Sequence, residues 1–236
     1  MCTQVLIARG YNRRRLPSKN TTQLAGLRLL ETYAGLAQRG EHLLGRLLGS
    51  ELPSQWQHYP ADDAIDVKQA YQWFYHSHAP EDRLNATEHG HLHFFARRKL
   101  WVHRLRSAAE IEWASLDDEA SQHVKTRHLL SIGLNAKGVP TSLFTVNSWV
   151  TGDLMLSASN TSLLLENMRL DTGYEAVDAV IESVITLYAA EIRQLLIKRD
   201  TLLFQNKAPG ILYNERFEIL SEMAIDLDAK LISVDV

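Results

Sequence analysis

Histidines are concentrated in one short part of the sequence, at YHSH in residues 75–78 and EHGHLHFF in residues 88–95. These two stretches hold five of the ten histidines of the chain. Imidazole nitrogens bind transition metals, and an ion held in this way can act as a Lewis acid or a redox centre. Cys2 is the single cysteine, so a metal site would use nitrogen and oxygen ligands. These residue types suit a divalent ion such as zinc, iron, copper or nickel, and they do not choose among them.

The spacing of two between these histidines predicts β-strands. Side chains alternate along a strand, so His76 and His78 share one face, as do His89, His91 and His93. In an antiparallel pair, opposite residues have position numbers with a constant sum, and an odd sum such as 76 plus 91 gathers all the rings on one face. The same register gathers the apolar residues on the other face: Tyr71, Trp73, Tyr75, Leu92 and Phe94. We predict the odd register, because a slip by one residue would mix the two sets.

Distances along a strand limit how many of these rings can bind one ion. Residues two apart are separated by about 6.6 Å and residues four apart by about 13 Å, so His89 and His93 cannot share an ion. Cross-strand partners lie about 4.5–5.5 Å apart at Cβ and can complete a site. Gly90 predicts a bulge or a close backbone approach in this stretch. The predicted ligands are His76, His78, His89 and His91, with His93 as a ligand or a base beside the site and Glu88 as a group that orients a ligand.

Two other stretches carry polar residues at suggestive spacing. LFTVNSWVTG in residues 143–152 places Thr145, Asn147 and Trp149 on one strand face, a pattern suited to lining a pocket, although Trp149 fits a core position equally well. HYPADDAID in residues 58–66 combines a proline-fixed turn with acidic residues, and we interpret it as a capped turn that enters the first strand. Arg199 and Asp200 are predicted to form a surface or half-buried ion pair at the end of a helix.

Apolar residues recur with helical spacing near both ends of the chain. This spacing predicts long helices over residues 21–50 and 174–204 and a short helix over residues 157–168. Between them the period changes to two and predicts strands over residues 71–78, 88–96, 128–134 and 141–149, the last two joined by the turn NAKG. Residues 217–222 are a candidate fifth strand, and the tail after them fits a short helix equally well. Residues 105–125 are predicted to be a polar insertion.

Strands in the middle of the chain and helices at both ends predict an α+β fold, an antiparallel sheet of four to five strands with long N-terminal and C-terminal helices packed on it. A chain of 236 residues that is 45% hydrophobic suits a single domain, over residues 21–236. Residues 1–20 contain basic residues and no acid, and they are predicted to be a basic, flexible N-terminal arm.

Charge and motif content exclude several classes of protein. A net charge of −3 gives no clustered positive surface, so neither nucleic acid nor a membrane is a predicted partner. No apolar run reaches the length of about 18 residues that crosses a bilayer. A single cysteine excludes an internal disulfide and suits a reducing compartment, so we expect a soluble, cytoplasmic protein. The metalloprotease helix, the serine nucleophile elbow, the phosphate-binding loop and the dinucleotide fingerprint are absent.

Several blocks occur together in this sequence: HYPADD, YHSH, EHGHLHFF, LFTVNSWVTG and KRD. Together they resemble an uncharacterised bacterial protein family, a domain of unknown function with HYP, YxHxH, EHGHxH and LFTxNxWVT blocks in this order. The similarity covers about residues 57–220. The resemblance implies the same organisation and brings no activity. At Ser148 this chain departs from the family, which has arginine before the tryptophan, so a basic pocket contact is not expected there.

Three hypotheses for function follow from the histidine face. The first is a histidine-ligated metal-binding protein, with a metal-dependent enzyme acting on a small molecule as its concrete form. The alternative is a non-catalytic small-molecule-binding module with a histidine and aromatic pocket and no metal. In the third, the histidine face is the interface of a homodimer, which mildly acidic pH would dissociate by charging the imidazoles.

Overall fold

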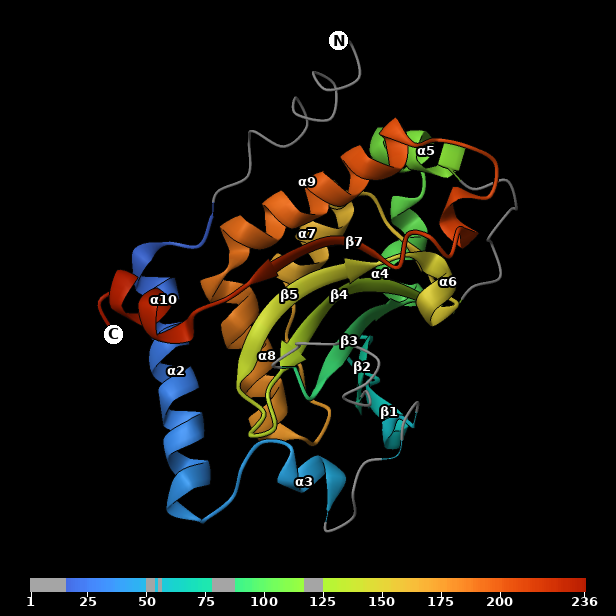
Figure 1. Cartoon of the computed structure of the whole chain (residues 1–236). Coiled ribbons are helices and arrows are strands. Elements are labelled where there is room, and N and C mark those ends of the chain that lie inside the picture. Colours follow the sequence, from blue (N-terminus) through green and yellow to red (C-terminus); the bar gives the residue numbers. More distant parts are fainter. Residues whose placement is uncertain (1–15, 50–53, 55–56, 78–87, 117–124) are drawn as a thin grey trace.

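The computed structural model describes residues 16–49, 54, 57–77, 88–116 and 125–236 (Figure 1). Its strands are β1 (Tyr59–Asp66), β2 (Tyr71–Ser77), β3 (Gly90–Arg97), β4 (Thr126–Leu134), β5 (Pro140–Val146), β6 (Leu154–Met155) and β7 (Ile219–Ala224). Its α-helices are α2 (Lys19–Gln38), α3 (Gly45–Leu48), α4 (Arg98–Trp101), α5 (Ala108–Trp113), α6 (Ser148–Thr151), α7 (Ala158–Glu166), α8 (Glu175–Leu187), α9 (Ala189–Gln205) and α10 (Leu227–Ser233). Short 3-10 turns are η1 (Val102–Arg104), η2 (Ala114–Leu116) and η3 (Ile211–Tyr213).

The strands in the described residues form one curved sheet in the order β1-β2-β3-β4-β5-β7, with antiparallel neighbours, and β6 pairs in parallel with β4 (Figure 1). The predicted α+β class is confirmed, but the predicted four to five strands are too few, because the sheet has seven. Strand β1 takes the place of the predicted capped turn, and its proline and acids hide the strand pattern. Strand β6 has two residues, which is too short to show alternation. The C-terminal part of the chain contains both the candidate fifth strand, as β7, and the candidate short helix, as α10.

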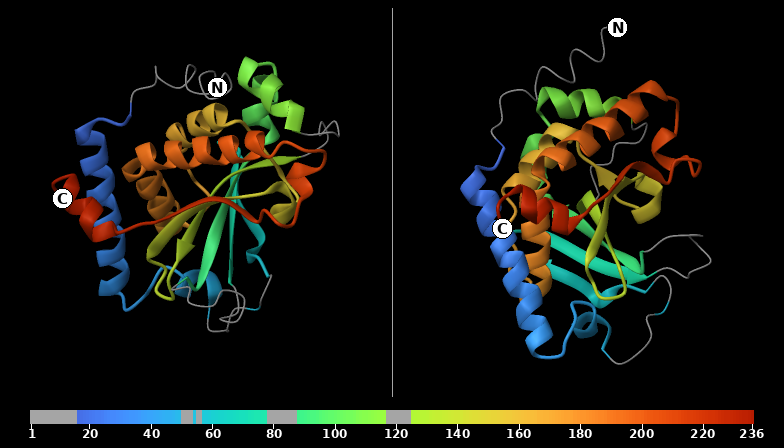
Figure 2. Two further views of the ribbon diagram at one scale, coloured as in Figure 1. Left: turned by 45° about the horizontal axis from the view of Figure 1, so that its top comes forward. Right: turned by 60° about the vertical axis from the view of Figure 1, so that its left-hand side comes forward.

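Helices α7, α8 and α9 cover one face of the sheet (Figures 1 and 2). The odd-numbered residues of β2 point toward them: Tyr71 Oη donates to Leu164 O at 2.8 Å, and Trp73 Nε1 donates to Asp178 Oδ1 at 3.0 Å. The main apolar core lies between this sheet face and the helices. The even-numbered residues of β2 therefore face the opposite side of the sheet.

The N-terminal helix differs from its prediction in length and in buried face. Helix α2 ends at Gln38, where the chain turns through Gly40 at φ 67°, and α3 is a separate turn. Its buried residues are Gly26, Leu29 and Leu36, whereas the apolar residues whose spacing predicts the buried face within α2, among them Leu24 and Leu27, are exposed, with Leu24 58% accessible. The helix carries leucines on two faces. Packing against α8 and α10 buries the face that contains Gly26, Leu29 and Leu36.

The second long helix is two helices that meet at Tyr188. Helical hydrogen bonds continue on both sides, because Tyr188 N donates to Val184 O and Ile192 N donates to Tyr188 O. The residues whose helical spacing predicts the buried face are buried from Val177 through Ile192 to Arg199, and Leu202 near the end of α9 is half-buried. The predicted short helix is α7, which Ser157 caps by accepting from Asn160 N. Within the described residues, no helix combines the length and apolar composition that a bilayer crossing needs.

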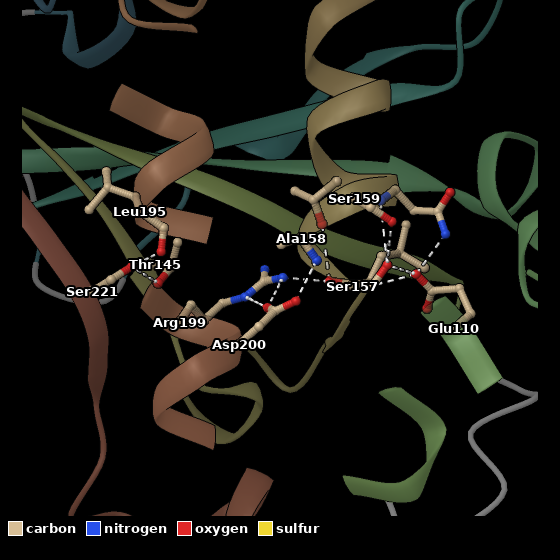
Figure 3. Close-up of polar contacts among 12 residues, drawn as sticks. Glu110, Thr145, Ser157, Ala158, Ser159, Leu195, Arg199, Asp200 and Ser221 are labelled. Atoms are coloured by element: carbon tan, nitrogen blue, oxygen red, sulfur yellow. Dashed lines mark hydrogen bonds and ion pairs between the residues drawn. The ribbon is translucent and has the colours of Figure 1, made fainter. Parts of the chain in front are cut away.

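A buried polar network joins α9 to the first turn of α7 (Figure 3). Arg199 Nε and Nη2 donate to Asp200 Oδ1 at 2.9 and 2.8 Å, and Nη2 also donates to Leu156 O at 2.6 Å. Asp200 Oδ2 accepts from Ala158 N at 2.7 Å. Arg199 is 0% and Asp200 4% accessible, so the prediction of a surface or half-buried ion pair is wrong: the pair is fully buried.

Candidate metal centre

Three of the predicted histidines lie together on the sheet face that points away from α7, α8 and α9. In the pairing of β2 with β3, His76 lies opposite His91 and Phe74 lies opposite His93. The sum of paired positions is therefore odd, as predicted from the apolar residues. Tyr75, Leu92 and the other residues predicted for the apolar face, Tyr71, Trp73 and Phe94, occupy the opposite, helix-covered face.

The rings of His76, His91 and His93 are close enough for one nitrogen from each to reach a common ion. Their candidate ligand atoms lie within 4.8 Å of one another. His76 Nε2 is 2.7 Å from His91 Nε2, and the ring centroids of His91 and His93 are 4.6 Å apart. All three side chains are buried, at 8%, 3% and 0% accessibility. Two histidines four residues apart on one strand would be too far apart to share an ion. This group instead combines the cross-strand pair His76 and His91 with His93, which lies two residues after His91 on the same strand.

Glu88 orients His91. Glu88 Oε1 lies 2.7 Å from His91 Nδ1, and its Oε2 accepts from Ser142 Oγ at 3.2 Å. A carboxylate can only accept, so His91 Nδ1 carries the proton and His91 Nε2 presents a lone pair toward His76. Histidine ligands of metals commonly donate their second nitrogen to a carboxylate in this way. Glu88 therefore has the orienting contact that the sequence predicted for it.

Space for the Glu88 carboxylate exists because residue 133 on β4, opposite His91, is glycine. A Cβ added to Gly133 would lie 2.4 Å from Glu88 Oε2 and 2.1 Å from Ser142 Oγ. We expect Gly133→Ala to displace Glu88 and to weaken zinc binding by roughly 10–100-fold, the usual effect of losing such an outer contact. Competition with a chromophoric chelator measures this. Gly35→Ala, whose Cβ would meet nothing closer than 3.5 Å, should leave zinc affinity unchanged, and equal affinities in the two variants would refute the assignment.

His93 is held by two polar groups that the sequence argument did not identify. Its Nδ1 lies 2.9 Å from Ser131 Oγ and 3.1 Å from His128 Nε2, so Nε2 is the nitrogen that an ion would use. His128 sits opposite Phe95, after a register shift in the pairing of β3 with β4. Simple alternation would have placed His128 with Leu130 on the helix face. No sequence signal marks the bulge that brings it to His93.

His128 is a neutral imidazole. Its complete burial, together with the positive charge of Arg199, lowers the pKa of His128 to about 3. Burial acts in this direction because it disfavours the charged form of the ring. Within the described residues, His128 Nδ1 has no hydrogen-bond partner. The side chain therefore supports His93 as an uncharged neighbour.

The other predicted ligands do not join this group in the described residues. His89 precedes β3, and its Nδ1 lies 2.6 Å from Tyr75 Oη, on the helix-covered side. Alternation fails for His89 because the strand begins only at Gly90. Gly90 admits this contact, since a Cβ there would lie 2.4 Å from Tyr75 Oη, which is the close approach that the sequence predicted. His78 lies outside the described residues.

The three candidate pocket residues of β5 and its continuation point elsewhere. Thr145 faces the helices and its Oγ1 lies 2.7 Å from Ser221 Oγ (Figure 3). The strand ends at Val146, so Asn147 instead caps α6 by accepting from Ser148 N, and Trp149 Nε1 donates to Phe217 O at 3.0 Å. The pocket-facing residues of this segment are their neighbours in sequence, Phe144, Val146, Val150 and Thr151.

The three histidines line a pocket of about 230 Å³. Its aromatic wall consists of Phe74, Phe95 and Phe144, and Phe144 packs edge-on against His91 at 4.9 Å. The remaining polar lining residues are His58, Asp63, Gln72, Thr151, Asp153 and Glu218. Burial raises the pKa of Asp153. The pocket thus combines three histidines whose nitrogens could bind a metal ion with an aromatic wall and a group of carboxylates.

Comparisons with known proteins give a family and no activity. A family model described as a domain of unknown function (DUF6969) matches residues 23–225. The match spans His76, His91 and His93 together with the residues that orient them. No curated protein and no solved structure matches the chain.

Proposed function

This chain belongs to the family described as a domain of unknown function (DUF6969), and we propose that it is a histidine-ligated metal-binding protein that acts as a metal-dependent enzyme on a small molecule. The observation that carries the proposal is the convergence of His76, His91 and His93, whose candidate ligand atoms lie within 4.8 Å of one another. Burial and mutual proximity disfavour the charged forms of these rings, and the neutral imidazole is the form that binds a metal ion.

The spacing of the rings fits a first-row transition metal. Two nitrogens at about 2.0–2.1 Å from an ion lie about 3.3 Å apart in a tetrahedron and about 2.9 Å apart in an octahedron. The distance of 2.7 Å between the Nε2 atoms of His76 and His91 needs a small outward rotation of the rings to reach these values. A set of imidazoles suits zinc, iron, copper or nickel.

The position of the donor set in a pocket favours catalysis over a structural role. Structural zinc sites are closed by four protein ligands, whereas catalytic sites keep a position open for water or substrate. His76, His91 and His93 line a pocket that also has an aromatic wall. When bound there, an ion would supply Lewis-acid or redox chemistry to a molecule in the pocket.

The lining of the pocket indicates the class of substrate. Its volume of about 230 Å³ is below the usual range for drug-sized ligands, so the substrate should be small. Among the described lining residues there are three carboxylates and neither lysine nor arginine. We therefore expect a neutral or cationic molecule with an apolar part, because an anion would be repelled by Asp63, Asp153 and Glu218.

One observation favours the alternative, a binding module without metal. The two Nε2 atoms at 2.7 Å can satisfy one another, with His76 as donor and the oriented His91 as acceptor. This arrangement gives a stable polar floor for a small ligand in the absence of an ion.

Metal-dependent stabilisation separates the two functions. For untagged, chelator-treated protein, we expect one of the four candidate ions to raise Tm by about 5–10 °C when its free concentration is about 100 times Kd, because binding then adds about 2.7 kcal/mol. Differential scanning fluorimetry and elemental analysis measure the shift and a stoichiometry of one ion per chain. No shift with any of the four ions would refute metal binding and leave the binding module.

A further inference from the structure

A hydrogen-bonded histidine and aspartate lie at the rim of the same pocket. His58 Nδ1 is 2.8 Å from Asp63 Oδ1, and both residues line the pocket. The His58 side chain is 42% accessible, so the pair is reachable from solvent and from the pocket. Because a carboxylate only accepts, this contact puts the proton on Nδ1 and leaves a lone pair on Nε2.

An interruption in the regular pairing of β1 with β2 positions this pair. Tyr59 pairs with Tyr75 and Ala64 pairs with Trp73, so the residues between them form a bulge on β1. Within the bulge, Asp63 has φ 54°, a left-handed conformation that aspartate tolerates better than most residues. Bulges often redirect a side chain next to a functional site. Here the bulge turns Asp63 toward His58.

Two further contacts fix the geometry. Gln72 Nε2 donates to Asp63 Oδ2 at 2.6 Å, so each carboxylate oxygen has its own donor. The His58 ring stacks on Phe74, with centroids 3.6 Å apart and an angle of 9° between the planes. Phe74 in turn packs against His76 and His93, at centroid distances of 5.8 and 5.2 Å. One aromatic ring therefore separates His58 from the three-histidine group.

We propose that His58 is the general acid–base of this pocket and that Asp63 is its positioning residue; the inference rests on the proposed function, in which a small molecule is bound beside the metal ligands. A water or a substrate hydroxyl in the pocket transfers its proton to His58 Nε2, and the electron pair of the O–H bond stays on the oxygen. That oxygen attacks an electrophilic atom of the bound molecule, and the bond from this atom to its leaving group breaks with the electron pair going to the leaving group. The imidazolium, stabilised by Asp63 at Nδ1, returns its proton to that leaving group. No oxidant or reductant is required.

The contact with Gln72 predicts the effect of Asp63→Asn. The amide side chain introduced at this position would turn its carbonyl oxygen toward Gln72 and its NH₂ group toward His58, because Gln72 donates through Nε2 here. His58 would then accept at Nδ1 and carry its proton on Nε2, the wrong tautomer for a base. Changing Gln72 to methionine as well removes the donor that holds the carbonyl oxygen of the introduced amide. The amide can then rotate so that this oxygen accepts from His58 Nδ1, which restores the original tautomer.

Acylation by diethyl pyrocarbonate tests this in full-length, chelator-treated protein, where the metal plays no part. The rate at His58, relative to the exposed His103, is followed by mass spectrometry. We expect Asp63→Asn to lower this ratio by about tenfold or more, Asp63→Asn with Gln72→Met to restore most of it, and the exposed neighbour Asp62→Asn to leave it unchanged.

Each other result overturns the proposal. A His58 that does not react in the wild-type protein cannot be reached by a substrate. An unchanged ratio in Asp63→Asn means that Asp63 does not set the tautomer. A loss that Gln72→Met fails to reverse indicates a merely structural role. Because the metal-dependent rise in Tm is measured separately, failure of the His58 proposal and failure of metal binding are distinguishable.

Discussion

Replacement of His91 by alanine is expected to abolish stoichiometric metal binding. His91 is the central ligand: its Nε2 faces His76 Nε2 at 2.7 Å, its ring adjoins His93, and its Nδ1 is held by Glu88. Loss of an outer contact costs roughly 10–100-fold in metal affinity, so loss of this ligand should cost more than about 100-fold. Equilibrium dialysis of untagged protein, followed by elemental analysis, should show a fall from one ion per chain to a small fraction.

Two variants make this result interpretable. His103→Ala removes an exposed histidine outside the cluster and should retain one ion per chain. His76→Ala removes the ligand on β2. Glu88 contacts His91, so this variant leaves the partner of Glu88 in place. Equal metal content in His91→Ala, His76→Ala and His103→Ala would falsify the three-histidine centre.

Replacement of Arg199 by methionine is expected to destabilise the fold by about 3–5 kcal/mol, the usual cost of leaving one member of a buried ion pair alone. Arg199 supplies two hydrogen bonds to Asp200 and one to Leu156 O, and no other charged partner of Asp200 is present among the described contacts (Figure 3). Urea unfolding at pH 7 measures the loss. Lys198→Met, at an exposed position beside it, should change stability by less than about 0.5 kcal/mol.

The loss should be smaller at pH 5 than at pH 7. Burial raises the pKa of Asp200 to about 6, against the opposing effect of Arg199. A carboxyl whose pKa is raised in the folded state binds a proton that the unfolded chain does not bind, so its contribution to stability falls as the pH rises through that window. Without Arg199 the pKa moves further upward, and protonation at pH 5 relieves the unpaired charge. A loss that is the same at both pH values would show that Asp200 does not change its protonation state between pH 5 and pH 7.

Strand periodicity makes the histidine face predictable. Residues two apart share a face, and the apolar residues of β2 and β3 admit one register, which the pairing of His76 with His91 confirms. The turn at Asn135–Gly138 is predictable for the same local reason, because Gly138 adopts φ 78° and its N donates to Asn135 O. The resemblance to a domain of unknown function is predictable from the sequence blocks and is confirmed by the family match.

Predictions fail where tertiary contacts override a local pattern. Helix α2 carries leucines on two faces, and only packing decides that Leu29 is buried and Leu24 exposed. Thr145 and Phe144 are neighbours on one strand, and the side of the sheet that α9 covers decides which of them lines the pocket. The bulge in β1 lies in the stretch predicted to be a turn, so the pairing of His58 with Asp63 is not foreseen.

Residue type and a spacing of two along the chain are local properties. They suffice to predict which side chains alternate along a strand and which chemistry the imidazoles allow. They also predict that histidines of two neighbouring strands share one face of the sheet. Folding adds the rest: which of those rings converge, that Glu88 and His128 support them, and that His58 meets Asp63 at the pocket rim. These contacts join separate strands and depend on strand ends and bulges. Their positions follow from packing across the sheet, which no local pattern encodes.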